Sequence, residues 1–190
     1  KMKVIQLHQE EKQLIMLAVE NNRQAQQQIY AKFSSKMLSV CRQYIKDIHH
    51  AEDVMITGFM KVFTNLKNFE HKGSFEGWIR RIMVYECIDF LRVKKNNFNH
   101  QDIEDVTISE NESVYEMEDF SVDDIQNMID NLPDGYKMVF NLYAIEGYKH
   151  QEIAEMLKIS EGTSKSQLSN ARKLLQQQIT ELKKKLNGTK

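Results

Sequence analysis

Residues 148–175 read YKHQEIAEMLKISEGTSKSQLSNARKLL, which predicts two short amphipathic helices joined by a tight turn. Ser160 is a favourable N-cap for the second helix, and Ile159 is expected to fill the corner between the two. Apolar residues at helical spacing give each helix one packing face. They are Ile153, Ala154, Met156 and Leu157 in the first helix, and Leu168, Ala171, Leu174 and Leu175 in the second. The stretch is therefore typical of a helix-turn-helix.

The second helix of this pair carries small polar and basic side chains away from its apolar row. We expect six of them to point outward: Thr163, Ser164, Lys165, Ser166, Ser169 and Asn170. Short polar side chains on an exposed helix can reach base edges in DNA, and Lys or Arg residues beside them can bind phosphates. This favours DNA recognition. The alternative is an ordinary helical hairpin with a solvated face.

Charge is distributed unevenly, although the formal net charge of the whole chain is only −1. Residues 1–95 carry 16 Lys or Arg against 10 Asp or Glu, and residues 137–190 carry 10 against 5. The intervening residues 96–136 contain 12 acidic residues and neither Lys nor Arg. Two basic bodies suit a polyanionic partner, while the acidic segment would be repelled by the same DNA. The segment therefore has a different partner or is a solvated, flexible linker.

The composition indicates long helices, because 190 residues include one proline and seven glycines. No segment reaches 18 apolar residues and no signal-peptide pattern occurs, so we expect a soluble, cytoplasmic protein without membrane insertion. Cys41 and Cys87 are expected to be reduced core residues. His49 and His50 are expected at a helix start rather than at a metal. We find no glycine-rich phosphate loop and no nucleophile motif, and expect no cofactor and no catalytic activity.

The first basic body begins with an amphipathic helix over residues 24–45, and a second helix follows after a break. We place Glu52 and Asp53 in the first turn of this second helix, where the helix dipole favours acidic residues. The core row of the first is Ile29, Phe33, Met37, Val40, Cys41, Tyr44 and Ile45, and that of the second is Met55, Phe59, Val62, Phe63 and Leu66. Another face of the second helix combines Asp53, Ile56, Thr57 and Met60. That face either binds a partner or makes a second core contact.

A third helix is predicted over residues 75–93, after a polar connection that contains Gly73. Its core row is Ile79, Met83, Cys87 and Phe90. Beside this row, aromatic and apolar residues alternate with cations: Trp78, Ile82 and Tyr85 with Arg80, Arg81 and Arg92. Aromatic rings can stack on unpaired bases while the cations bind phosphates, which suits single-stranded nucleic acid. The alternative is that Trp78 and Tyr85 are core aromatics.

Together these motifs resemble a sigma factor of the sigma-70 family, in its extracytoplasmic-function group. The resemblance rests on AEDVMITGFMKVF at 51–63, GSFEGWIRRIMVYECIDFLR at 73–92, NLPDGYKMVFNLY at 131–143, and the helix-turn-helix. It covers roughly residues 24–185. It implies an all-α fold with four parts: an N-terminal extension at 1–23, a region 2 domain at 24–95, an acidic linker at 96–120, and a region 4 domain at 121–190.

The resemblance also implies a function, which is to bind core RNA polymerase and direct it to promoters. It places Asp53, Ile56, Thr57 and Met60 on the clamp helices of the polymerase β′ subunit. It places residues 136–143 against the β flap. For the −10 element, the segment from Phe69 to Phe75, with Lys72, resembles the loop that pockets a flipped base. Trp78, Arg80, Arg81 and Tyr85 would line the melted strand. The −35 element would be read by Lys165, Ser166, Ser169 and Asn170, beside Ser164, with Thr163, Arg172 and Lys173 near phosphates. An anti-sigma factor, often membrane-anchored in this family, would bind a protein that is monomeric when free.

Several residues depart from the family pattern. Ile56 and Thr57 stand where a Gln-Glu pair is usual, which makes the docking face more apolar. Tyr85 replaces an Asn in the −10 helix, and Lys158 replaces the glycine of the turn. In the recognition helix, Ser164, Gln167 and Asn170 replace a Val and two Arg residues, so we expect weaker phosphate binding and a different base preference at −35.

Two other functional classes fit parts of the chain. A conventional helix-turn-helix repressor or activator fits the C-terminal half, and predicts tight duplex binding without polymerase. A helical scaffold with no role on nucleic acid fits the Gln-rich and Met-rich helices. The sigma-factor interpretation instead predicts weak DNA binding by the free protein, because the acidic segment can screen both basic faces.

Overall fold

The structure is a computed structural model that describes the backbone of residues 2–97 and 120–187, and the side chains of residues 10–93 and 120–184. Every regular element in these ranges is helical. The chain divides into two compact units, residues 1–90 and 91–190. The predicted all-α fold with two helical domains is therefore confirmed. Most of the predicted linker, 96–120, lies outside the described residues.

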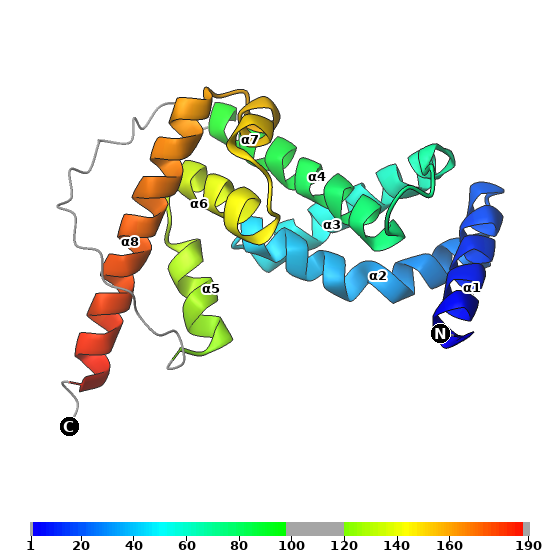
Figure 1. Ribbon diagram of the computed structural model, residues 1–190, viewed down its shortest axis with the longest axis horizontal. Helices are drawn as coiled ribbons and strands as arrows, with labels where there is room; N and C mark the ends of the chain where they lie inside the picture. The colour runs from blue at the N-terminus through cyan, green and yellow to red at the C-terminus, as the bar shows by residue number, and fades with distance from the viewer. Residues whose placement is uncertain (1, 98–119, 188–190) are drawn as a thin grey trace. The chain divides into compact units, whose positions relative to one another are not determined.

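The first unit contains α1 (Met2–Val19), α2 (Arg23–Tyr44), α3 (Ile48–Asn65), a short 3-10 turn η1 (Leu66–Asn68) and most of α4 (Phe75–Asn97) (Figure 1). The predicted core rows of α2, α3 and α4 meet in its interior. Phe33 of α2 and Phe75 of α4 bring their ring centroids to 5.7 Å in an edge-to-face arrangement. Cys41 and Cys87 are both buried and reduced, which confirms their predicted core positions.

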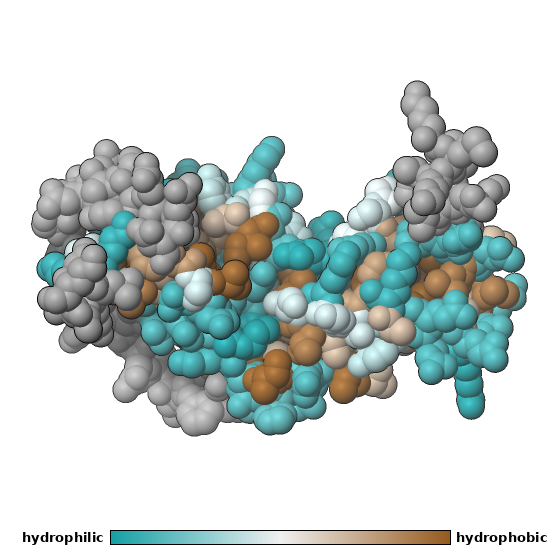
Figure 2. Space-filling model, turned by 90° about the horizontal axis from the view of Figure 1, so that it is seen from below, coloured by the Kyte–Doolittle hydropathy of each residue, from teal (hydrophilic) through white to brown (hydrophobic). Residues whose placement is uncertain are grey.

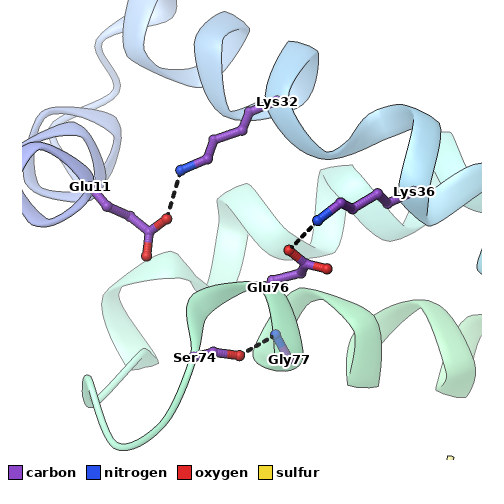
Figure 3. Close-up of polar contacts among 6 residues, drawn as sticks. All are labelled: Glu11, Lys32, Lys36, Ser74, Glu76 and Gly77. Atoms are coloured by element: carbon purple, nitrogen blue, oxygen red, sulfur yellow. Dashed lines mark hydrogen bonds and ion pairs between the residues drawn. The ribbon is translucent and has the colours of Figure 1, made fainter. Parts of the chain in front are cut away.

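Helix α1 is an integral part of this unit rather than a mere extension of the chain. It packs against α2 and η1, and buries Ile15 and Ala18. Its Glu11 carboxylate accepts a hydrogen bond from the Lys32 ammonium at 2.8 Å (Figure 3). One turn further along α2, Lys36 pairs with Glu76 of α4, also at 2.8 Å. The same face of α2 is therefore tied to α1 and to α4.

Helix α3 begins at a cap that the periodicity did not reveal. The Asp47 carboxylate accepts a hydrogen bond from the backbone N–H of His50 at 3.0 Å, and this bond holds the pKa of Asp47 below its ordinary value. The predicted helix start at His49 and His50 is confirmed. The prediction that Glu52 lies in the first turn is wrong by about one turn, as it is for Asp53, because the cap sits ahead of the apolar stripe.

Gly58 allows α3 and α4 to approach closely. A Cβ built at this position would lie 2.3 Å from the Met83 sulfur, and Met83 is fully buried. On the same side, the Lys61 ammonium pairs with Glu86, an acid that α4 otherwise buries. These contacts bring one side of α3 against α4.

The second unit contains α5 (Val122–Asp130), α6 (Asp134–Phe140), a π-helical turn η2 (Asn141–Ile145), α7 (His150–Leu157) and α8 (Glu161–Asn187). Ser121 caps α5 through a reciprocal capping box with Asp124. One core cluster joins α6 and the preceding turn to α8, and consists of Leu132, Tyr136, Phe140, Ala171, Leu174 and Leu175. The apolar residues predicted to hold the second helix of the pair thus include three that pack in this cluster.

Lys158 ends α7 in the left-handed conformation, with φ 56° and ψ 45°. A Cβ in this conformation is strained, and glycine relieves the strain at the cost of a more flexible unfolded chain. We expect Lys158→Gly to raise the free energy of unfolding of the second unit by about 0.5–1 kcal/mol. Native-state hydrogen exchange of the α7 and α8 amides measures this change. Lys158→Ala is the matched control and should show no gain, because alanine keeps the Cβ; an equal gain in both variants would contradict the explanation.

Candidate nucleic-acid interface

The turn between α7 and α8 has the geometry of a helix-turn-helix. The Ser160 hydroxyl accepts a hydrogen bond from the backbone N–H of Thr163 at 2.9 Å, which confirms its predicted role as N-cap. The hydroxyls of Ser160 and Thr163 lie 2.8 Å apart. Ile153 and Met156 of α7 and Leu168 of α8 are buried beneath the turn. Helix α8 therefore begins in a defined position relative to α7.

One side of α8 presents polar groups to solvent. Lys165, Ser166 and Ser169 are exposed, which confirms their predicted outward orientation, and Arg172 is exposed beside them. Thr163 and Lys173 are half-buried. The Ser166 hydroxyl donates to the backbone carbonyl of Thr163 at 3.0 Å. The arrangement is a strip of hydroxyl and cationic groups of the kind that reaches into a DNA groove.

Ser164 does not belong to this strip, so its predicted outward orientation is wrong. Its relative exposure is 0%, and its hydroxyl lies 2.9 Å from Nδ1 of His150 on α7. Ser164 precedes Leu168 by four residues and Ala171 by seven, which places it on the packing face of the helix. The position of Ser164 along the helix therefore determines its inward orientation. Its buried hydroxyl is satisfied by the hydrogen bond with His150.

Asn170 also departs from a purely outward orientation. It is half-buried, and its side-chain nitrogen donates to the Tyr136 hydroxyl of α6 at 3.3 Å. Gln167 lies over the start of the same helix, since a Cβ at Gly135 would come within 3.3 Å of its amide nitrogen. The two residues that replace family arginines are thus turned toward α6, which narrows the strip left for DNA.

Sequence reasoning missed a stacked group beside the strip. The Tyr143 ring of η2 stacks on the His150 ring, with centroids 4.7 Å apart and planes inclined by 23°. The Arg172 guanidinium lies 5.7 Å from the Tyr143 centroid, within the range of a cation–π interaction. These three residues come from η2, α7 and α8, and no spacing in the sequence indicated that they meet.

The His150–Ser164 hydrogen bond can be tested by a double-mutant cycle. Removing one buried partner leaves the other unsatisfied, whereas replacing both with apolar groups is close to neutral. We expect Ser164→Ala and His150→Phe each to lower the free energy of unfolding of the second unit by about 1 kcal/mol. The double variant should lose about 0.5–1.5 kcal/mol less than the sum. Hydrogen exchange of the α8 amides gives all four values, and strict additivity would show that the contact contributes nothing.

The aromatic residues of the first unit form a layered cluster at the start of α4. Phe69 and Phe75 are buried, so their rings are not presented at the described surface. They form the floor beneath Trp78, which is half-buried. The Trp78 ring centroid lies 5.5 Å from that of Phe69 and 6.0 Å from that of Phe75, with its plane only 14° from that of Phe75. The Trp78 side chain is thus partly buried against these rings and partly exposed to solvent.

The loop before α4 and the cations behind it flank this cluster. His71 has a φ of 56°, and its ring lies tilted against that of Phe69 with 4.8 Å between the centroids; Gly73 has a φ of 97°. Lys72 is exposed and pairs with Glu70 at 2.6 Å. Further along α4, the Arg81 guanidinium lies 5.9 Å from the centroid of Tyr85, whose relative exposure is 37%. Aromatic and cationic groups therefore lie together at this surface, with Arg80 half-buried.

The row Asp53, Ile56, Thr57 and Met60 on α3 is exposed throughout. Met60 has a relative exposure of 67% and Ile56 of 49%, and the Thr57 hydroxyl donates to the Asp53 carbonyl at 2.9 Å. Figure 2 shows brown apolar patches within the hydrophilic surface. Large apolar residues are also exposed on α1, namely Met16, Leu17 and Val19. Within the described residues no other element covers the row, so it does not make a second core contact there.

Other kinds of site find no support in the part of the chain that the structure describes. No group of three His, Cys, Asp or Glu side chains there is arranged to hold a metal ion. None of the described helices combines the length and the apolar character needed to cross a membrane.

Comparisons with known proteins agree with this arrangement. Residues 29–97 match the family model of sigma-70 region 2, and residues 122–175 match that of sigma-70 region 4. The ECF RNA polymerase sigma factor SigW of Bacillus subtilis is 29% identical over 163 residues, which cover 79% of this chain and 86% of the relative. The ECF RNA polymerase sigma-E factor of Haemophilus influenzae is 24% identical over 169 residues, covering 81% and 87%. The fold is also similar to a solved structure, that of the sigma factor RpoE in complex with the anti-sigma factor NepR from Bartonella quintana. The TM-score is 0.53 and the sequence identity is 19%, and the match covers 81% of this chain and 96% of that one. This similarity supports the fold.

Proposed function

The chain belongs to the sigma-70 family of RNA polymerase sigma factors, in its extracytoplasmic-function group, and from this premise we propose how it directs core polymerase to promoters. It is a specificity subunit that reads −10 and −35 elements and acts without a catalytic activity of its own. The observation that carries the assignment is the order of the two units. A region 2 unit with an exposed apolar face and an aromatic cluster precedes a region 4 unit with a helix-turn-helix.

The −35 element is read by the exposed strip of α8. Lys165, Ser166 and Ser169 face the major groove, and Thr163, Arg172 and Lys173 lie where phosphates would pass. Asn170 contacts DNA at the edge of the strip, because its side-chain amide also donates a hydrogen bond to the Tyr136 hydroxyl. Ser164 supports the helix through His150 and does not contact DNA.

The −10 element is handled by the aromatic cluster at the start of α4. Trp78 offers a stacking surface for an unpaired base, and the buried rings of Phe69 and Phe75 hold it in place. Arg80, Arg81 and Tyr85, with Lys72 in the preceding loop, lie beside the opened strand. Extruding a base costs a few kcal/mol, so a rigid stacking surface favours strand opening once the duplex begins to melt.

The Asp53–Met60 row of α3 docks on the β′ clamp helices of core polymerase. Its apolar side chains are exposed in the free protein and become buried on binding, which drives association. For the β flap, the contact falls on Tyr143, which is exposed at η2. Tyr136 is buried and its hydroxyl accepts a hydrogen bond from Asn170, so we assign it no contact with the flap.

An anti-sigma factor is the expected inhibitory partner. The similar sigma factor from Bartonella quintana was solved in complex with one, and we propose a partner of the same class for this chain. Such a partner would cover the surfaces that polymerase and promoter need.

Transcription with core RNA polymerase tests the function. The chain is mixed with core enzyme, and run-off transcripts are sequenced from a library of genomic promoters. We expect initiation at a defined set of sites that share −10 and −35 elements, and none with core enzyme alone. Failure to bind core polymerase, together with tight duplex binding by the chain alone, would overturn the assignment in favour of a conventional helix-turn-helix regulator.

A further inference from the structure

An acidic residue lies at the beginning of the recognition helix, on the side that is proposed to face DNA. Glu161 is the first residue of α8, and its carboxylate lies 2.7 Å from the ammonium of Lys165, one turn further on. Both side chains are more than half exposed. Within the described side chains of α8, the only other acid is Glu181, more than five turns away. Glu161 therefore stands among the groups that approach the base pairs.

Glu161 is ionised at neutral pH. The hydrogen bond from Lys165 lowers the pKa of Glu161, and the charge of Lys165 lowers it further. The ion pair is exposed to water, and exposed pairs contribute little net stability, so it opens readily when another partner is offered. The carboxylate is available as a hydrogen-bond acceptor, and Lys165 as a donor.

A carboxylate on a DNA-facing helix has a marked energetic consequence. It is repelled by the phosphates of any duplex, which lowers affinity without regard to sequence. That loss is recovered only where the acid meets a hydrogen-bond donor on a base edge. In the major groove, the N4 amino group of cytosine is the donor that Glu and Asp accept from, while Lys donates to O6 and N7 of guanine. Because Glu161 and Lys165 lie one turn apart on one face, they can address neighbouring base pairs.

We propose that Glu161 is a specificity-determining residue of this sigma factor, whose carboxylate accepts a hydrogen bond from a cytosine amino group in the −35 element. Lys165 exchanges its bond with Glu161 for a guanine edge in the same step. The inference rests on the proposed −35 reading by α8. Its consequence is that Glu161 disfavours duplexes that lack the cytosine.

A role confined to helix stability makes a different prediction. An acid in the first turn interacts favourably with the helix dipole, and its loss would lower stability without changing base preference. Thermal unfolding of each variant therefore accompanies the binding measurement. A change in preferred base is the readout that a stability role does not produce.

The experiment selects −35 sequences from a randomised duplex library with the full chain assembled on core RNA polymerase. We expect the natural chain to enrich cytosine at one −35 position about tenfold. Glu161→Ala should abolish that preference and keep the others. Glu161→Gln should shift the same position toward adenine, because a Gln amide pairs with adenine N6 and N7. Glu181→Gln is the matched control, with the same loss of charge on the same helix, and should select the natural sequence.

The outcomes separate this inference from the proposed function. If all four proteins enrich the same −35 sequence, Glu161 does not read a base and the inference is overturned, while the sigma-factor function stands. If the natural chain binds no core polymerase or enriches no −35 sequence at all, the proposed function itself fails. A lower unfolding temperature for Glu161→Ala with an unchanged consensus would assign Glu161 to helix stability alone.

Discussion

Replacing Met60 with aspartate is expected to weaken binding to core RNA polymerase by about a hundredfold or more. Met60 is exposed on α3, and no residue of the described first unit covers it. Burying a methionine side chain contributes about 1.5–3 kcal/mol, and a carboxylate buried without a partner opposes association further. Since 1.4 kcal/mol corresponds to a factor of ten, loss of the apolar contact alone accounts for about one to two factors of ten. Fluorescence anisotropy of the labelled chain titrated with core enzyme gives the dissociation constant.

Gln27→Asp provides the matched control for this experiment. Gln27 is exposed on α2, so the substitution adds the same charge to the same unit outside the proposed docking row. We expect it to leave the dissociation constant within about twofold, a change of less than 0.5 kcal/mol. Both variants should unfold at the temperature of the natural chain, because both positions are exposed. Equal affinity of Met60→Asp and the natural chain would rule out the Asp53–Met60 row as the docking face.

Replacing Trp78 with alanine is expected to slow promoter opening by about ten- to a hundredfold, while core binding changes by less than about twofold. The ring lies nearly parallel to Phe75 and against Phe69, and it remains partly accessible. Stacking a base on an aromatic ring contributes about 1–3 kcal/mol, and this contribution exists only after the strands separate. The rate of opening is followed by the fluorescence of 2-aminopurine placed in the −10 element.

Trp78→Phe is the control, because it keeps an aromatic surface on the same floor. It should retain most of the opening rate. Equal losses of opening and of core binding in Trp78→Ala, with a lower unfolding temperature, would mark Trp78 as a folding residue of the aromatic cluster. The partly buried ring makes this comparison necessary, since truncation also removes contacts with Phe69 and Phe75.

The helices themselves were predictable because the signals that define them are local. Ser160 caps α8, as expected from its position next to an amphipathic pattern. Lys158 adopts the left-handed conformation at the turn where the family pattern has glycine. The core rows of α2 and α8 follow from helical periodicity alone. Glu52 and Asp53 lie about one turn further into α3 than predicted, because the cap of the helix, Asp47, lies ahead of the apolar stripe.

The candidate site was predictable only where one helix face decides exposure. Lys165, Ser166 and Ser169 face outward as expected, whereas Ser164 was assigned by its polarity although its helical position places it in the core. The burial of Phe69 and Phe75 beneath Trp78 could not be predicted either, because it depends on how the loop before α4 folds over the unit. A residue type indicates what a side chain can do, but packing decides which molecule it contacts.

By itself the sequence determined an all-α chain with two basic helical units, an acidic segment between them, and a helix-turn-helix with its caps and core rows. These properties depend on residues within a few turns of one another, which composition and periodicity report. The tertiary structure decided the hydrogen bond of His150 to Ser164 and of Asn170 to Tyr136, the stack of Tyr143 with its neighbours, and the exposure of the Asp53–Met60 row. The contacts join side chains that lie 7 to 34 positions apart in the sequence and on different elements. The exposure of the row depends on which surfaces the other elements leave uncovered. Only the packing of whole helices determines both.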